Sequence, residues 1–145
     1  MSASSARSEL TERPTKRRAG AEAGGLPVAD PRPRVVDGLL RGARCVQCRH
    51  PLAQPDVPWC PVCFGAVEDC GFAPVGVVWS ATTVRIPVGR WAAPFGLAYL
   101  DVVDGPRVLV HVRCDPAPRI GERIEFTCTD SGDLAEIGLE REDNR

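Results

Sequence analysis

The stretch 44–63, RCVQCRHPLAQPDVPWCPVC, decides the fold because it holds two Cys-x-x-Cys pairs. Cys45 and Cys48 form the first pair, Cys60 and Cys63 form the second, and eleven residues separate the two. Two residues between cysteines let both sulfurs of a pair turn toward one point, and two facing pairs supply a tetrahedron of thiolates. We therefore predict a closed structural Zn²⁺ site with these four cysteines as its ligands.

Other uses of the four cysteines stay open at the level of sequence. A pair of disulfides or a redox-active Cys-x-x-Cys has the same spacing, and an iron site takes the same four thiolates. His50 lies two residues after Cys48 and could replace one thiolate, but four well-spaced cysteines favour the all-cysteine site. The stretch around them has almost no apolar core, so we expect the metal to hold it together.

Composition bounds the class of protein. A chain of 145 residues with 43% hydrophobic residues is at most one ordinary domain plus a small module. No run approaches the roughly 18 consecutive apolar residues that a membrane helix needs. The first 18 residues lack the apolar segment of a secretory signal. Seven cysteines, an odd number, suit a reducing compartment. We expect a cytoplasmic protein with no membrane association.

Charge divides the chain into a basic start and an acidic body. Residues 1–34 hold seven Lys and Arg against four Asp and Glu, whereas residues 35–145 hold eleven against fifteen. Ser, Ala, Gly, Pro and charged residues dominate 1–34, which predicts a disordered tail, and 141–145 form a second charged tail. An acidic body disfavours nucleic-acid binding, since phosphate contacts by Lys and Arg supply most of the non-specific affinity.

The remaining residues predict a mainly β protein. After a lead-in and zinc ribbon over 35–69, residues 70–140 alternate short apolar runs with turn sequences. Asp104-Gly105 between two such runs is a strong hairpin signal. With no convincing helix, this pattern favours a five-stranded OB-fold barrel. The predicted strands are Val75–Ile86, Gly96–Val103, Arg107–Arg113, Arg123–Cys128 and Leu134–Leu139.

Residues 35–140 resemble a bacterial and archaeal family that joins a rubredoxin-like zinc ribbon to an OB-fold, catalogued as domain of unknown function thirty-five. Five pieces carry the resemblance through their order and spacing. They are VVDGLLRGARCVQC at 35–48, CPVC at 60–63, VVWSATTVR at 77–85, Pro94-Phe95 ahead of AYLDVVDGPRVLVHV at 98–112, and DPAPRIGERIEF at 115–126.

The resemblance implies a non-catalytic accessory subunit in acyl-CoA metabolism. Relatives pair with thiolase-like enzymes, including lipid-transfer-type thiolases and aldol-lyases of steroid side-chain breakdown, or with hydratases, and help to cover the CoA-ester channel. The residues agree with this interpretation, because a site closed by four thiolates keeps no open position for a substrate. Neither His50 nor His111 has a nucleophile or carboxylate partner in a motif.

Large side chains on predicted loops are the candidate contacts with a partner or with CoA. Aromatic side chains and Arg dominate the energetics of interfaces, and Arg also matches phosphate groups. The same aromatic rings could instead plug the ends of the barrel. The candidates are Trp59 and Phe64 beside the second cysteine pair, Arg90, Trp91 and Phe95 in the loop after the first barrel strand, and Arg107.

Single-stranded nucleic-acid binding is the alternative function. An OB-fold with this role needs aromatic platforms beside basic residues. Trp79, Tyr99 and Phe126 are the candidate stacking residues, and the run RPTKRR at 13–18 would add affinity.

Overall fold

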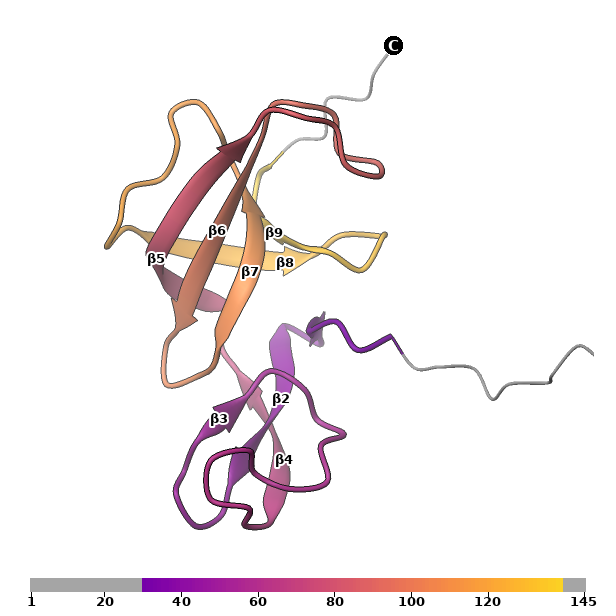
Figure 1. The fold of residues 1–145 in the computed structure, drawn as a ribbon, viewed down its shortest axis with the longest axis vertical. Coiled ribbons are helices and arrows are strands. Elements are labelled where there is room, and N and C mark those ends of the chain that lie inside the picture. The colour runs from indigo at the N-terminus through magenta and orange to yellow at the C-terminus, as the bar shows by residue number, and fades with distance from the viewer. Residues whose placement is uncertain (1–29, 140–145) are drawn as a thin grey trace, which may run out of the picture.

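The computed structural model describes residues 30–139, which form two β modules stacked end to end (Figure 1). The predicted disorder of residues 1–29 and the predicted charged tail at 141–145 lie outside the described residues. Within residues 30–139 no helix is long and apolar enough to cross a membrane. The two modules correspond to the predicted ribbon and the predicted barrel.

The ribbon is a small antiparallel sheet built on its second strand. Its strands are β1 (Arg34–Val36), β2 (Leu39–Cys45), β3 (Pro51–Leu52) and β4 (Val67–Phe72). β4 pairs with β2 over its full length, from Leu40↔Phe72 to Cys45↔Val67. β1 and β3 pair with successive parts of β2, and the last residue of β2 is Cys45. The sheet therefore delivers the first cysteine pair at its end.

Two glycines allow this arrangement. Asp37 and Gly38 both have positive φ, 52° and 75°, which makes the two-residue turn that joins β1 to β2. At Gly42 an added Cβ would lie 2.2 Å from the carbonyl oxygen of Leu52. A side chain at Gly42 would therefore push β3 away from β2 and displace the segment that leads out of the first cysteine pair.

The module boundaries differ from those predicted. The sequence predicts that residues 30–34 belong to the disordered tail. In the structure Arg32 donates a hydrogen bond to Asp133 in the β8–β9 loop, and Arg34 is the first residue of β1. The ribbon sheet continues to Phe72 instead of ending at 69, because β4 pairs with β2 through backbone hydrogen bonds. The polar sequence of β4 gives no pattern from which this strand could be predicted. The barrel begins at Val75.

The second module is a closed barrel, which confirms the predicted five-stranded OB-fold. Its strands are β5 (Val75–Val84), β6 (Phe95–Val102), β7 (Arg107–Val112), β8 (Arg123–Cys128) and β9 (Leu134–Glu136). They follow the order β5-β6-β7-β9-β8, and β8 returns to β5. Every pair is antiparallel except β7 with β9. This is the Greek-key connectivity of an OB-fold.

Alternation along the strands fills the barrel. Val108, Val110 and Val112 on β7 point inward and are buried, while Leu109 is exposed on the other face. Phe126 lies at the centre with 0% of its surface exposed. Burying each such side chain contributes on the order of 1.5–3 kcal/mol, so the barrel has a core of its own.

The ribbon sheet has no hydrophobic core of its own and packs against the end of the barrel. Leu40 and Phe72 belong to the ribbon strands, yet they pack in one buried cluster with the barrel valines. The Arg44 guanidinium lies 5.3 Å from the Phe72 ring centroid and donates to the carbonyl oxygen of Asp104 in the β6–β7 turn. The cysteine end of the ribbon is thus held at a fixed position beyond the barrel.

Candidate metal centre and docking surface

The two cysteine pairs meet at one point. The Sγ atoms of Cys45, Cys48, Cys60 and Cys63 all lie within 4.8 Å of one another. Sγ of Cys45 is 3.4 Å from Sγ of Cys63, and Sγ of Cys48 is 3.6 Å from Sγ of Cys60. Tetrahedral Zn–S bonds of about 2.3 Å put neighbouring sulfurs about 3.8 Å apart. The cluster therefore has the donor set and the spacing of a four-thiolate metal site.

The first pair is a tight knuckle shaped by backbone hydrogen bonds. The Cys45 amide donates to the His50 carbonyl at 3.0 Å, and the Arg49 amide donates to the Cys45 carbonyl at 3.1 Å. Arg49 takes a positive φ of 64° to complete the turn. The turn aims the Cys48 amide at Sγ of Cys45, 3.4 Å away. His50 serves this knuckle through its backbone, and its ring is not among the clustered donors.

The second pair repeats the same geometry further along the chain. The Cys60 amide donates to the Gly65 carbonyl at 2.9 Å, and the Phe64 amide donates to the Cys60 carbonyl at 2.9 Å. Phe64 also has a positive φ, 62°, and the Val62 amide points at Sγ of Cys60. Two equivalent knuckles facing each other are what a symmetric tetrahedral site requires.

The thiols influence one another strongly. The backbone amides of Cys48 and Gln47 lower the pKa of the Cys45 thiol to about 6, against the effect of burial. The His50 amide lowers the pKa of Cys48, but burial and the other three thiols oppose it and raise that pKa to about 12. Once one thiol has ionised, its negative charge makes it harder for a neighbouring thiol to lose its proton. A divalent cation at the centre removes this conflict, so the residues fit a metal ion.

Exposed apolar side chains surround the cysteines. Trp59 is 56% exposed and Phe64 is 77% exposed, which places both predicted contact residues on the second knuckle. Val46 and Val62 are exposed beside them. We call Val46, Trp59, Val62 and Phe64 the knuckle surface. Sequence reasoning missed the two valines, which occupy middle positions of the two Cys-x-x-Cys knuckles.

The predicted contacts in the β5–β6 loop behave differently. Phe95 is only 8% exposed and packs against the rings of Trp91 and His111, so its ring is not offered to a partner. The Trp91 ring stacks on His111 with centroids 3.5 Å apart and 8° between planes. Its Nε1 donates to Oδ2 of Asp133 at 3.2 Å. His111 alternates with the inward-facing Val110 and Val112, so these rings pack together on the outer face of the barrel wall. Arg90 is exposed.

The loop and the knuckle surface do not form one surface. In Figure 1 the β5–β6 loop lies at the end of the barrel away from the ribbon, and the cysteine knuckles lie at the opposite end of the molecule. The knuckle surface and the β5–β6 loop therefore do not form one continuous docking surface, although Trp91 and Arg32 of the lead-in both bind Asp133.

Arg107 and the predicted base-stacking residues lie on the barrel wall. Arg107 pairs with Asp101, lowering the pKa of that carboxyl group, and its guanidinium lies 3.9 Å from the Trp79 ring centroid. Trp79 is exposed at a β-bulge opposite Tyr99, which meets it edge-on. Phe126 is buried in the core, so its predicted role as a stacking platform is wrong.

Comparisons with known proteins agree with this architecture. Residues 72–129 match the family described as "ChsH2, C-terminal OB-fold domain". No curated protein sequence matches the chain. A solved structure described as "Ltp2-ChsH2(DUF35) aldolase" is similar with a TM-score of 0.54 and 22% sequence identity, over 68% of this chain and 83% of that chain. The predicted resemblance is supported, because residues 72–129 are similar to the ChsH2 C-terminal OB-fold domain and the solved structure shares the fold of this chain.

Proposed function

We propose that this chain is a non-catalytic subunit that docks on an acyl-CoA-processing enzyme in lipid or steroid metabolism. Two comparisons support this proposal. The barrel matches the ChsH2 OB-fold family, and the similar solved structure is described as an aldolase that contains ChsH2 together with Ltp2. The partner class that fits both is an aldolase of the thiolase-like kind, and a hydratase is the runner-up.

The single observation that carries the proposal is the knuckle surface. Its four members are all apolar, and Phe64 and Val62 are more than half exposed, although each follows or lies between buried or half-buried cysteines. Single exposed apolar residues are ordinary, but four exposed apolar side chains on two neighbouring rigid turns, two of them aromatic, are typical of a protein contact. Backbone bonds and the metal centre fix the patch, so little conformational entropy is lost on docking.

We propose Zn²⁺ as the ion at the centre of the knuckles, with a purely structural role. Cys45, Cys48, Cys60 and Cys63 would hold it as thiolates in a closed tetrahedron. Such a site leaves no position for substrate or water, so the ion would shape the knuckle surface and take no part in chemistry. Metal analysis of the purified protein tests zinc against iron, since a four-thiolate iron site is coloured and redox-active.

Co-purification tests the docking proposal. The full chain carrying an affinity tag is expressed in its native host, and the chains that co-purify are identified. The wild type is expected to recover an aldolase, thiolase-like or hydratase subunit. The double variant Val62→Ser, Phe64→Ser is expected to lose it while keeping its metal.

Ile120→Ser is the matched control. Ile120 is 77% exposed, as Phe64 is, but it lies in the β7–β8 loop of the barrel. The control variant should recover the partner as the wild type does. Loss of the partner in the Ile120 variant but not in the knuckle variant would place the interface on the barrel. Recovery of nucleic acid alone, released by a modest rise in salt, would instead support the single-stranded nucleic-acid alternative.

A further inference from the structure

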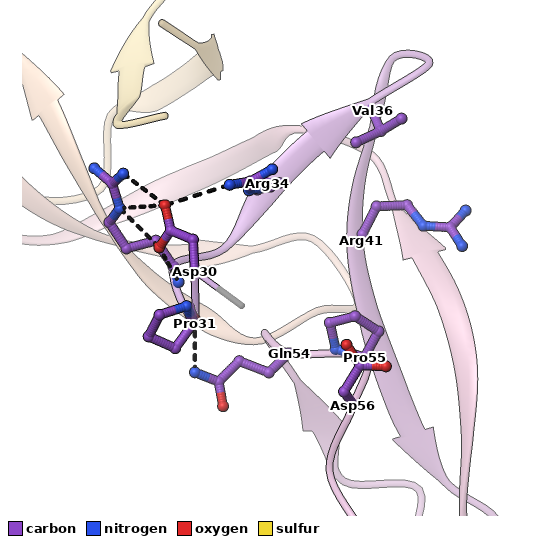
Figure 2. A pocket seen from close by; sticks show the side chains of 9 residues that line it. Asp30, Pro31, Arg34, Val36, Arg41, Gln54, Pro55 and Asp56 are labelled. Atoms are coloured by element: carbon purple, nitrogen blue, oxygen red, sulfur yellow. Dashed lines mark hydrogen bonds and ion pairs between the residues drawn. The ribbon is translucent and has the colours of Figure 1, made fainter. Parts of the chain in front are cut away.

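The ribbon also carries a concave site, which no residue of the knuckle surface lines. A cavity of about 630 Å³ opens where the lead-in at 30–34, the β1–β2 hairpin and the connector at 54–56 meet (Figure 2). This volume is within the range of pockets that hold small organic ligands, about 300–1,000 Å³. None of the predicted contact residues lines it.

The walls of the cavity are tied to one another and to the barrel. Nε2 of Gln54 donates to the carbonyl oxygen of Pro31 at 2.7 Å, which joins the connector to the lead-in. Arg32 donates to Oδ1 of Asp133 at 2.8 Å, which joins the lead-in to the β8–β9 loop. Arg34 and Arg41 are held by the β1–β2 pairing. Three chain segments therefore converge on the cavity in a fixed arrangement.

One carboxylate in the cavity is already satisfied. Asp30 accepts hydrogen bonds from both the backbone amide and the guanidinium of Arg32, and Nη2 of Arg34 lies 3.3 Å away. These bonds, those of Arg32 first, hold the pKa of Asp30 well below its ordinary value. Asp30 is thus paired with both Arg32 and Arg34, and Arg32 is paired with Asp133 as well.

The β1–β2 hairpin brings two arginines together at the cavity. Arg34 and Arg41 are directly opposite in the β1–β2 register, where like charges disfavour pairing. In Figure 2 the Arg41 side chain extends away from Asp30. Within residues 30–139 the Arg41 guanidinium makes no hydrogen bond or ion pair. Arg34 is paired with Asp30, whereas the Arg41 guanidinium has no such partner in this range, so a bound anion would relieve the repulsion between the two arginines.

We propose that this cavity binds an organic phosphate, with Arg34 and Arg41 as the phosphate ligands. A guanidinium offers a planar fork of donors that matches phosphate oxygens, which favours this anion. Pro31, Val36 and Pro55 give an apolar wall for the carbon part of the ligand. The Gln54 amide nitrogen is engaged with Pro31, and its oxygen is left to accept a hydrogen bond from the ligand. The proposal concerns this chain alone and does not rest on docking to an enzyme.

Calorimetric titration of the purified, metal-loaded full chain tests the site. The probes are adenosine 5′-monophosphate and coenzyme A, which carry phosphate on a carbon frame, with inorganic phosphate and adenosine as reference probes. At least one organic phosphate is expected to bind at least tenfold more tightly than either reference probe. Arg41→Gln is expected to weaken that binding about tenfold, and Arg34→Gln with Arg41→Gln to abolish it.

The control variant is Arg123→Gln, which removes an exposed arginine from β8 on the barrel. It should bind the probe as the wild type does, and unchanged amide spectra should show that all three variants are folded. The proposal is overturned if neither organic phosphate binds at millimolar concentration. It is equally overturned if inorganic phosphate binds as well as the organic probes, or if all three variants bind like the wild type. Each of these outcomes is independent of which chain co-purifies.

Discussion

The two ends of the molecule treat their aromatic side chains in opposite ways. At the barrel end, Trp91 stacks on His111 and bonds to Asp133, and Phe95 is buried. At the ribbon end, Trp59 and Phe64 are exposed around a centre that has no apolar core. A ring that packs against its own chain stabilises the fold, whereas a ring fixed on a rigid turn without a partner lowers solubility. This difference points to the ribbon as the end that meets another protein.

Loss of the metal should give the largest difference in stability between the two modules. Cys60→Ser, or removal of the ion by a chelator, is expected to unfold the ribbon, because metal binding contributes on the order of 10 kcal/mol to such sites. The barrel is expected to stay folded on its own core, with a lower melting temperature. Amide spectra recorded with and without the metal measure both effects.

Cys114→Ser is the control for this change, since Cys114 lies after β7 and outside the metal cluster. It should leave the ribbon signals in place. A single transition that takes both modules together would show that the barrel does not fold without the ribbon.

Two phenylalanines give the next largest contrast. Phe126→Ala should destabilise the protein by roughly 3–5 kcal/mol, because it opens a cavity in the barrel core. Phe64→Ala removes the same atoms from an exposed site and should change the free energy of unfolding by less than about 0.5 kcal/mol. Denaturant unfolding measures both values. A large loss for Phe64→Ala would mean that its ring stabilises the knuckle instead of waiting for a partner.

The barrel should also respond to pH, through the half-buried imidazole of His111. Burial lowers the pKa of His111, and nearby Asp133 only partly opposes this. The folded state therefore takes up a proton less readily than the unfolded state, whose histidine has a pKa of about 6.5. Stability should be level above that pH and should fall as the pH drops below it.

Melting temperatures between pH 7.5 and pH 5 test this effect, with His111→Gln as the comparison. The variant should lose the part of the slope that belongs to the imidazole. Asp133 does not confuse the result in this range, because its pKa is lowered. Burial alone would raise that pKa, but hydrogen bonds from Trp91, Ser131 and Arg32 outweigh burial. An unchanged slope in His111→Gln would show that the stacked ring does not control the pH response.

The smallest expected effect is in the first knuckle. Arg49 has a φ of 64°, a conformation that is unfavourable for most residues with a side chain and open to glycine. Arg49→Gly should therefore be neutral or should stabilise the ribbon by up to about 1 kcal/mol, measured by competition for the metal with a chelator. Phe64→Gly is the equivalent change in the second knuckle, and it should have a similar effect on metal affinity while removing the exposed ring.

The cysteine cluster and the barrel could be predicted from the sequence, because both depend on local patterns. Cysteine spacing is read directly, and the alternating valines of β7 mark its buried face. Asp37-Gly38 is the same hairpin signal as Asp104-Gly105. The β1–β2 hairpin could therefore have been predicted from the sequence, although it is not among the predicted strands. The polar strand β4 could not be found in this way, because it is held by backbone pairing to β2.

The contacts that decide which rings are free could not be read from the sequence. Trp91 reaches His111 and Asp133, residues that are distant along the chain. Arg32 and Asp133 are 101 positions apart, and no periodic pattern links them. Closing the barrel brings these groups together, so the separation of the two candidate surfaces appears only in three dimensions.

The shared cluster of Leu40 and Phe72 ties metal supply to the lifetime of the chain. Both residues lie on ribbon strands, but they cover the end of the barrel. A chain that loses its ion would uncover apolar surface on both modules at once, which is what proteases and chaperones act on. Such a chain would be degraded before it could dock on the proposed partner, so a bound metal would make assembly depend on a correctly folded knuckle surface.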